Sequence, residues 1–317
     1  MPSLKEIKSA NSSLRTQDPT LSLTAVFVGG TSGLGLATLR AFATHIPHPT
    51  AVIVGRSAAR FEQQLQALRA LNPAGTFTFI EHEIELLRDV DATSKLVQKT
   101  LDGKRIDLLY LSQGYISFAG REDNADGLDK SISLRYYGRT RFTQNLLPSM
   151  SSTGRAITVL AGTQEGKVFE DDLDLERNYS IPNTMAHFAT LMTLSYDHLA
   201  AQQENTDKTF IHVFPGLVST GLLGRSASGI LGYLFRWVVD PLLGLLVAMK
   251  PEDVGERMLW YATAGELAAG QGTAKCVTID DKSAVKEIEL LKGYRERGFE
   301  RKVADWEGRV FERATAA

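Results

Sequence analysis

Three glycines near the start of the chain have a spacing that suits nucleotide chemistry. Gly29, Gly33 and Gly35 follow an apolar run at residues 25–28 and precede a helical pattern. Glycine permits a tight turn and a close backbone approach, and the N–H groups that begin a helix attract a pyrophosphate. Because strand, glycines and helix occur together, they predict a dinucleotide site. The expected cofactor-binding residues of this segment are Gly29, Thr31, Ser32, Gly33, Leu34 and Gly35.

The end of the second apolar run distinguishes between two forms of dinucleotide. An NAD site places an acid here, about 20 residues beyond the glycines, where it would repel a 2′-phosphate. In this chain the run at residues 51–54 is followed by Gly55, Arg56 and Ser57, and the first acid is Glu62. An arginine binds phosphate through charge-assisted hydrogen bonds. Arg56 therefore predicts NADP(H) as the cofactor.

The elements that must position these residues alternate along the chain. Short apolar runs predict strands at residues 25–28, 51–54, 76–80, 108–111, 156–160, 210–214 and 275–279. Helical patterns lie near residues 4–9 and then at 34–43, 58–71, 90–101, 129–147, 183–203 and 251–264. Apolar strands separated by helices of this length are typical of a parallel sheet covered on both faces. The sequence thus predicts an α/β, Rossmann-like, doubly wound parallel sheet.

Composition indicates an ordinary soluble globular protein. The 317 residues are 43% hydrophobic with a formal net charge of −2, and no basic run indicates nucleic-acid binding. The single cysteine, Cys276, excludes an internal disulfide framework and favours a reducing compartment such as the cytoplasm. The polar N-terminus does not resemble a secretory signal, and no uncharged apolar run reaches the roughly 18 residues of a membrane span. No metal site is expected.

The chain has no repeats and no linker-like segment, so we expect one domain over residues 1–317. Residues 22–165 form its dinucleotide-binding half, and residues 283–317 form a charged C-terminal extension with an amphipathic helix on the outside. The apolar segment at residues 221–250 predicts a lid over a bulky hydrophobic ligand. A core helix pair, a dimer contact in a homo-oligomer, and an interfacial membrane helix are its alternatives.

Three motifs resemble those of the short-chain dehydrogenase/reductase family. Residues 28–35, VGGTSGLG, are similar to the family's TGxxxGxG, with Val28 in place of threonine. Residues 112–114, SQG, stand where the family has NAG, and residues 215–220, PGLVST, match its PGxVxT in full. The resemblance covers residues 22–280 and implies further cofactor contacts. These would be made by Ser112, Gly114, Pro215, Gly216, Val218 and Thr220.

The family's usual catalytic residues do not reappear. The family uses asparagine, serine and a Tyr-x-x-x-Lys pair, in which the lysine lowers the tyrosine pKa so that the hydroxyl donates a proton. None of the nine tyrosines in this chain is followed four residues later by lysine. The matching positions hold Met185 and Ala189 for the pair, Ala161 for the serine and Arg135 for the asparagine.

The altered positions resemble a divergent fungal branch of the family, found in secondary metabolism. The segments SLRYYGRTRFTQNLLP, FEDDLDL and VFPGLVST are similar to reductase-type proteins of indole-alkaloid pathways, some of which reduce an iminium or guide a ring closure. That resemblance implies a site carried by Arg135 and by Asp171 or Asp172, facing each other across the cleft. An iminium is already cationic, so it accepts hydride without an acid and is stabilised by a carboxylate.

Other side chains near these positions have two interpretations each. His187, in the helix of residues 183–203, is either an acid active near neutral pH or a structural histidine. Tyr136 and Tyr137 are adjacent, so at most one of them faces a cleft. The acidic run at residues 170–174 is either a solvated loop or part of the site.

Three functions agree with these observations. The first is an NADP(H)-dependent reductase that acts on an activated bond, iminium or conjugated, of a bulky apolar intermediate. The second is a non-redox cyclase or isomerase that keeps the nucleotide as part of its pocket. The third is a catalytically dead NADP(H) sensor. Oxidation of NADPH in the presence of substrate separates the first from the other two.

Overall fold

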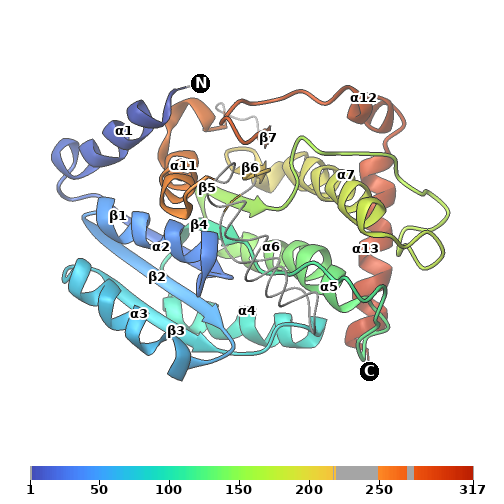
Figure 1. Cartoon of the computed structure of the whole chain (residues 1–317), viewed down its shortest axis with the longest axis horizontal. Helices are drawn as coiled ribbons and strands as arrows, with labels where there is room; N and C mark the ends of the chain where they lie inside the picture. The colour runs from blue at the N-terminus through green and yellow to red at the C-terminus, as the bar shows by residue number, and fades with distance from the viewer. Residues whose placement is uncertain (1, 217, 219–248, 270–274, 317) are drawn as a thin grey trace.

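The computed structural model describes residues 2–216, 218, 249–269 and 275–316, and these contain one seven-stranded sheet (Figure 1). Its strands are β1 (Ser22–Val28), β2 (His48–Gly55), β3 (Thr76–Glu81), β4 (Ile106–Leu111), β5 (Met150–Val159), β6 (Thr209–Val213) and β7 (Lys275–Ile279). They lie in the order β3-β2-β1-β4-β5-β6-β7, and every neighbouring pair is parallel. The predicted strands and the Rossmann-like doubly wound sheet are confirmed.

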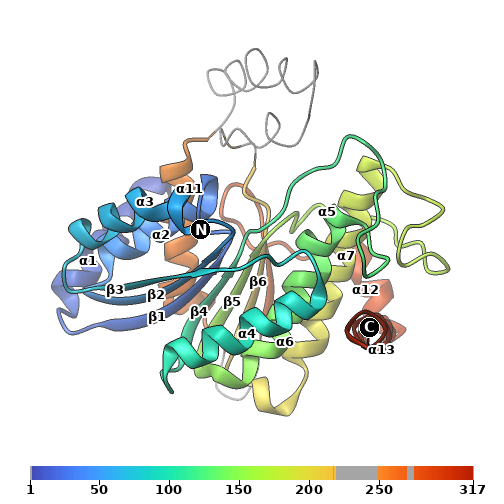
Figure 2. The same ribbon diagram turned by 90° about the horizontal axis from the view of Figure 1, so that it is seen from below.

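Helices cover both faces of the sheet, as the crossovers between parallel strands require (Figure 2). One face carries α1 (Leu4–Gln17), α2 (Gly33–His45), α3 (Ala58–Leu71) and α11 (Pro251–Thr263). The other carries α4 (Leu87–Leu101), α5 (Lys130–Ile132), α6 (Gly138–Leu146), α7 (Ile181–Ala200), α12 (Glu289–Glu296) and α13 (Phe299–Thr315).

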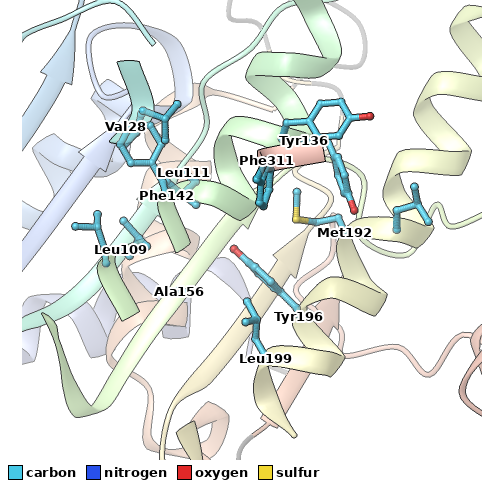
Figure 3. Close-up of a cluster of buried hydrophobic side chains, with 14 of the residues drawn as sticks. Val28, Leu109, Leu111, Tyr136, Phe142, Ala156, Met192, Tyr196, Leu199 and Phe311 are labelled. Carbon is cyan, nitrogen blue, oxygen red and sulfur yellow. The ribbon is translucent and has the colours of Figure 1, made fainter. Parts of the chain in front are cut away.

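Each face of the sheet has its own hydrophobic core, because successive side chains of a strand point to opposite faces. In β1, Val26 and Val28 belong to the core under α4, α6 and α7, whereas Ala25 and Phe27 belong to the core under α2 and α11. All four are fully buried. Figure 3 shows part of the first core, in which strand residues meet aromatic side chains of the helices.

The N-terminal helix is longer than the sequence predicts. The pattern suggested a helix at residues 4–9, but α1 continues to Gln17. Ser3 and Glu6 form a capping box that fixes its start. Ile7 is fully buried, and the amide of Asn11 donates to Glu256 of α11. Because α1 is mostly polar, its hydrophobic periodicity does not indicate its full length. Its contacts with α11 account for the additional turns.

The helix predicted at residues 129–147 is interrupted. Between α5 and α6 lies a π-helical turn, η1 (Ser133–Tyr137), in which the amide of Gly138 donates to the carbonyl of Ser133. A π-turn inserts an extra residue into a helix and is frequent at functional sites. Hydrophobic periodicity does not reveal such an insertion, so the sequence predicted one continuous helix.

The C-terminal extension contains α12 and α13. The helix α13 buries one face, with Val303, Trp306, Val310 and Phe311, against the rest of the molecule. It packs on α7 and α4 (Figure 2). The division of the chain into a dinucleotide-binding half and a substrate part stays a prediction.

Some predictions fall outside the described residues. The expected lid at residues 221–250 is described only at its last two residues, and Thr220 is not described. Among the described helices, none is both long and apolar enough to cross a membrane. The described residues also contain no cluster of three or more metal-ligating side chains.

Candidate active site

A cavity of about 580 Å³ opens along the carboxyl ends of the strands, where ligands bind in doubly wound folds. Its wall contains most of the residues that the sequence predicts for cofactor binding: Gly29, Thr31, Ser32, Gly33, Leu34, Gly35, Arg56, Ser112, Gly114 and Pro215. Gly216 and Val218 lie next to this wall in the chain and are not part of it. The structure thus brings the predicted residues of four separate segments to one site.

The glycine turn after β1 leaves no room for side chains. A Cβ on Gly35 would come 2.1 Å from the carbonyl oxygen of Gly29, and one on Gly29 would come 2.5 Å from the amide nitrogen of Gln113. Gly29 also has a φ of +89°, which other residues rarely adopt. Ser112 fixes the turn to β4, because its amide donates to Val28 and its hydroxyl donates to Gly29.

The helix α2 begins directly at this turn and presents its N-terminus to the cavity. The side chain of Ser32 stands at the cap position and makes no capping hydrogen bond. The first amides of a helix have no partner within it, and the helix dipole favours an anion at this end. At the neighbouring strand, Arg56 follows β2 with its side chain exposed and in the cavity wall. The cavity therefore offers two separate sites for phosphate.

Two buried arginines from η1 and α6 line the opposite part of the cavity. Arg139 donates to the carbonyl oxygens of Gln113 and Val159 at 2.5 Å and 2.7 Å, and to the hydroxyl of Thr158. It thereby ties the ends of β4 and β5 together. Burial, and then the charge of Arg135, lowers the pKa of Arg139 to about 9. Sequence analysis missed Arg139, although its spacing of one helical turn from Arg135 was a usable signal.

Arg135 has no comparable set of partners. It is buried to 7% exposure, and its Nε has no hydrogen-bond partner. Within the described chain neither Arg135 nor Arg139 forms an ion pair. Burial lowers the pKa of Arg135, and the nearby Tyr179, Asp129 and Tyr115 partly oppose this effect. Arg135 thus lines the cavity with a guanidinium that no carboxylate of the described chain neutralises.

Gln113 and Tyr115 are two further wall residues that the sequence did not single out as side chains. Both polar side-chain atoms of Gln113 are buried without a partner. Burial, together with the charges of nearby acids, raises the pKa of Tyr115, so its hydroxyl keeps its proton. Gln113 is the middle residue of the SQG segment and Tyr115 follows that segment, so their position after β4 was the available signal.

The sequence resemblance assigns the proton-transfer positions to Met185, Ala189 and Ala161, whose side chains have no ionisable proton. Met185 of α7 lines the cavity, while Ala189 and Ala161 are buried. The amide of Ala161 donates to Nε2 of His212 at 3.2 Å. The side chains at these three positions therefore pack against their neighbours and cannot act as an acid.

His187 is a structural histidine. Its Nδ1 accepts from the amide of Phe169, and its Nε2 lies 3.0 Å from the carbonyl oxygen of Leu173, to which it donates. The ring is fully buried, and burial lowers the pKa of His187 to about 4. It therefore stays neutral and holds the loop after β5. Tyr136 and Tyr137 are also buried, and neither lines the cavity.

The structure does not bring Asp171 and Asp172 to Arg135. Asp171 is exposed and pairs with Arg177 in the same loop. Asp172 accepts hydrogen bonds from the amides of Glu176, Arg177 and Asn178. Burial would raise the pKa of Asp172, but the bonds from Asn178 and its neighbours lower it overall. Neither aspartate is in the cavity wall, so the described geometry does not support the prediction that they face Arg135.

The sheet order, the glycine turn between β1 and α2 and the cavity beyond the strand ends define a dinucleotide-binding α/β protein. Residues 23–169 match the family model described as short chain dehydrogenase. Together with the relatives described next, this match shows that the chain belongs to the short-chain dehydrogenase family.

The similar proteins include fungal sequences. Oxidoreductase AN1596 of Emericella nidulans is 39% identical, over 86% of this chain and 80% of its own length. Short-chain dehydrogenase/reductase SAT2 of Stachybotrys chartarum is 29% identical, over 92% of this chain and 86% of its own. Among solved structures, a short chain dehydrogenase from Burkholderia cenocepacia in complex with NADP has a TM-score of 0.57 at 16% identity, over 82% of this chain and 97% of its own. That likeness agrees with the fold.

Proposed function

We propose that the protein is an NADP(H)-dependent reductase that acts on an activated bond of a bulky, apolar biosynthetic intermediate. Its relatives in fungi are named oxidoreductases, and similar solved structures hold NADP. A role in fungal secondary metabolism, as in alkaloid biosynthesis, is part of the proposal and comes from the resemblance of residues around Arg135.

The residues present fit NADP(H). The turn at Gly29 and Gly35 packs closely against its own backbone and the segment after β4, and the start of α2 lines the cavity, where its first amides would bind a pyrophosphate. Arg56 would bind the 2′-phosphate, since the end of β2 carries no acid to repel it. When bound, the cofactor supplies a hydride to the substrate.

One observation carries the choice of substrate: Arg135 lines the cavity and forms no ion pair within the described chain. The apolar side chains of Leu134, Leu160 and Met185 share this wall, while Gln113 adds further unpartnered polar atoms. Such a mixture suits a large apolar molecule with one oxygen-bearing group.

The chemistry of Arg135 favours a conjugated carbonyl compound over an iminium. A guanidinium repels a cation in a site of low dielectric constant. When a conjugated carbon accepts hydride, negative charge develops on the carbonyl oxygen, and a fixed N–H donor stabilises that charge. The carbon next to the carbonyl then takes its proton from water, so no acid is required at Met185 or Ala189.

The test compares three probes with purified protein and deuterium-labelled NADPH. Chalcone represents the conjugated carbonyl compounds, a dihydro-β-carboline represents the iminium and acetophenone represents a simple ketone. We expect NADPH oxidation with chalcone, and deuterium at the carbon β to its carbonyl. Faster oxidation with the dihydro-β-carboline would overturn the preference for a conjugated carbonyl. Conversion of a probe without NADPH oxidation would support a cyclase or isomerase, and NADPH binding without any conversion would support a sensor.

Replacement of Arg135 tests its role directly. Arg135→Ala should lower kcat/KM by on the order of 10²-fold or more, as loss of one oxyanion donor typically does. Its affinity for NADPH should change little, because the phosphate sites lie elsewhere. The matched control is Arg155→Gln, since Arg155 is also buried, donates to the carbonyl of Tyr261 and lies away from the cavity. Equal rates for Arg135→Ala and the unmodified protein would refute the role.

A further inference from the structure

The π-turn that carries Arg135 is held on three sides. The hydroxyl of Ser133 donates to the carbonyl of Glu85 at 2.5 Å, and the hydroxyl of Tyr137 donates to Asp174. The hydroxyl of Tyr136 donates to Oε1 of Glu307 at 2.6 Å, in a fully buried contact. Arg135, between these anchors, is directed to the cavity. Three side chains of this turn therefore anchor it to the rest of the protein, whereas Arg135 lines the cavity.

Glu307 is the most distant of these anchors in sequence. It lies on α13 and is 1% exposed. Its other oxygen, Oε2, accepts from Ser195 of α7 at 3.1 Å and from Gln144 of α6 at 3.4 Å. One carboxylate thus joins η1, α6 and α7 to the C-terminal helix. The ring of Tyr136 lies against the rings of Tyr137, Phe188 and Trp306.

Burying a carboxylate at this position is energetically unfavourable, because the charged group loses its contact with water. In the described part of the chain Glu307 forms no ion pair, and burial raises its pKa to about 7. An apolar residue would serve the packing of α13, whereas the carboxylate accepts from three donors, and a buried donor left without its acceptor costs about 1–3 kcal/mol. Packing of α13 alone therefore does not account for glutamate at this position.

We propose that Glu307 is a positioning residue for the active site: through Tyr136 it sets the π-turn so that Arg135 reaches the cavity. The C-terminal helix is then a part of the catalytic apparatus although none of its residues lines the cavity. This inference rests on the role proposed above for Arg135. It adds that Glu307, on a helix that does not line the cavity, determines where the side chain of Arg135 points.

The test uses two replacements of Glu307 that differ in hydrogen bonding. Glu307→Leu keeps the approximate volume and removes the acceptor, whereas Glu307→Gln keeps an acceptor for Tyr136. We expect Glu307→Leu to lower kcat for chalcone about tenfold or more, since small misplacements of a catalytic group have effects of this size. KM for NADPH should stay within about twofold, and the melting temperature should fall as well, because buried donors lose their acceptor. Glu307→Gln should restore most of kcat.

The matched control is Val303→Ala on the same helix. Val303 is fully buried in the core and makes no hydrogen bond to η1 through its side chain. Its truncation should lower the melting temperature and leave kcat unchanged. If Glu307→Leu behaves like Val303→Ala, with stability lost and kcat kept, Glu307 only anchors α13 and the inference is overturned.

Crystal structures of the unmodified protein and of Glu307→Leu provide a readout without turnover. A shift of the Arg135 guanidinium by about 1 Å or more would support the inference, because shifts of this size matter for catalysis. An unmoved Arg135 would overturn it. This result is distinct from failure of the proposed function, which is shown by full activity of Arg135→Ala whatever Glu307 does.

Discussion

The side chain of Arg135 occupies the space in which a side chain at Gly114 would stand. A Cβ built on Gly114 would come 2.4 Å from Cγ of Arg135, and Gly114 has a φ of +145°. The glycine after β4 therefore serves two purposes: it permits an unusual backbone conformation, and it gives the arginine stem a path to the cavity. The position of the Arg135 side chain therefore depends on the absence of a side chain at Gly114.

We predict that Gly114→Ala displaces Arg135. The new methyl group overlaps with Cγ, and the backbone strain adds a cost on the order of 1–3 kcal/mol. Turnover should fall as it does in Arg135→Ala. In a double-mutant cycle, Gly114→Ala should cost less stability in the Arg135→Ala background, with a coupling of about 1 kcal/mol or more. Urea unfolding of the four proteins measures this coupling, and additive effects would show that the overlap is relieved elsewhere.

The parts of the site that depend on short segments could be predicted from the sequence. The glycine turn and Arg56 directly follow strands, and the parallel sheet brings such ends to one edge. Arg135 lies within a helical segment, and its place in the site was predicted from the family resemblance. The position of Asp171 could not be predicted in this way. It lies in a loop of about 20 residues between β5 and α7, and no periodicity fixes the direction of such a loop. The contact of Tyr136 with Glu307 joins residues 171 apart, and no local pattern indicates it.

The form of the cofactor should depend on Arg56. We expect Arg56→Asp to weaken NADPH binding roughly 10- to 100-fold, the value of one hydrogen bond to a charged group, and to weaken NADH binding little or not at all. Fluorescence titration of both nucleotides measures the change. Arg60→Asp, one helical turn further on and outside the described cavity wall, should alter the ratio less. Equal affinities of the unmodified protein for the two nucleotides would contradict the assignment.

The two aspartates of the loop after β5 should behave differently from one another. Asp171→Ala removes an exposed ion pair, and such pairs contribute about 0–1 kcal/mol, so stability and turnover should change little. Asp172→Ala leaves three backbone amides without their acceptor and should cost about 1–3 kcal/mol of stability. Thermal melts and turnover of chalcone separate the two effects. Loss of turnover at full stability in either variant would restore the carboxylate to the site.

Stability below neutral pH should depend on His187. Burial lowers its pKa from the ordinary 6.5 to about 4, so between these values the unfolded chain binds a proton that the folded chain does not. The stability that the neutral ring contributes is therefore complete above pH 6.5 and is lost as the pH falls toward 4. The loss is roughly 3 kcal/mol if the full pKa difference applies. Glu307 acts in the opposite direction, because its raised pKa makes the folded chain gain a proton as the pH falls from about 7.

A comparison of the unmodified protein with His187→Gln removes the contribution of Glu307, since both proteins contain it. Urea unfolding at several pH values should show that the difference in stability between the two shrinks as the pH falls from 6.5 to 4. The exposed His48 provides the matched control, because His48→Gln should follow the unmodified protein at every pH. A difference between the unmodified protein and His187→Gln that is constant across this range would mean that His187 protonates equally in both states. The ring would then be accessible to water and again a candidate acid for the reaction.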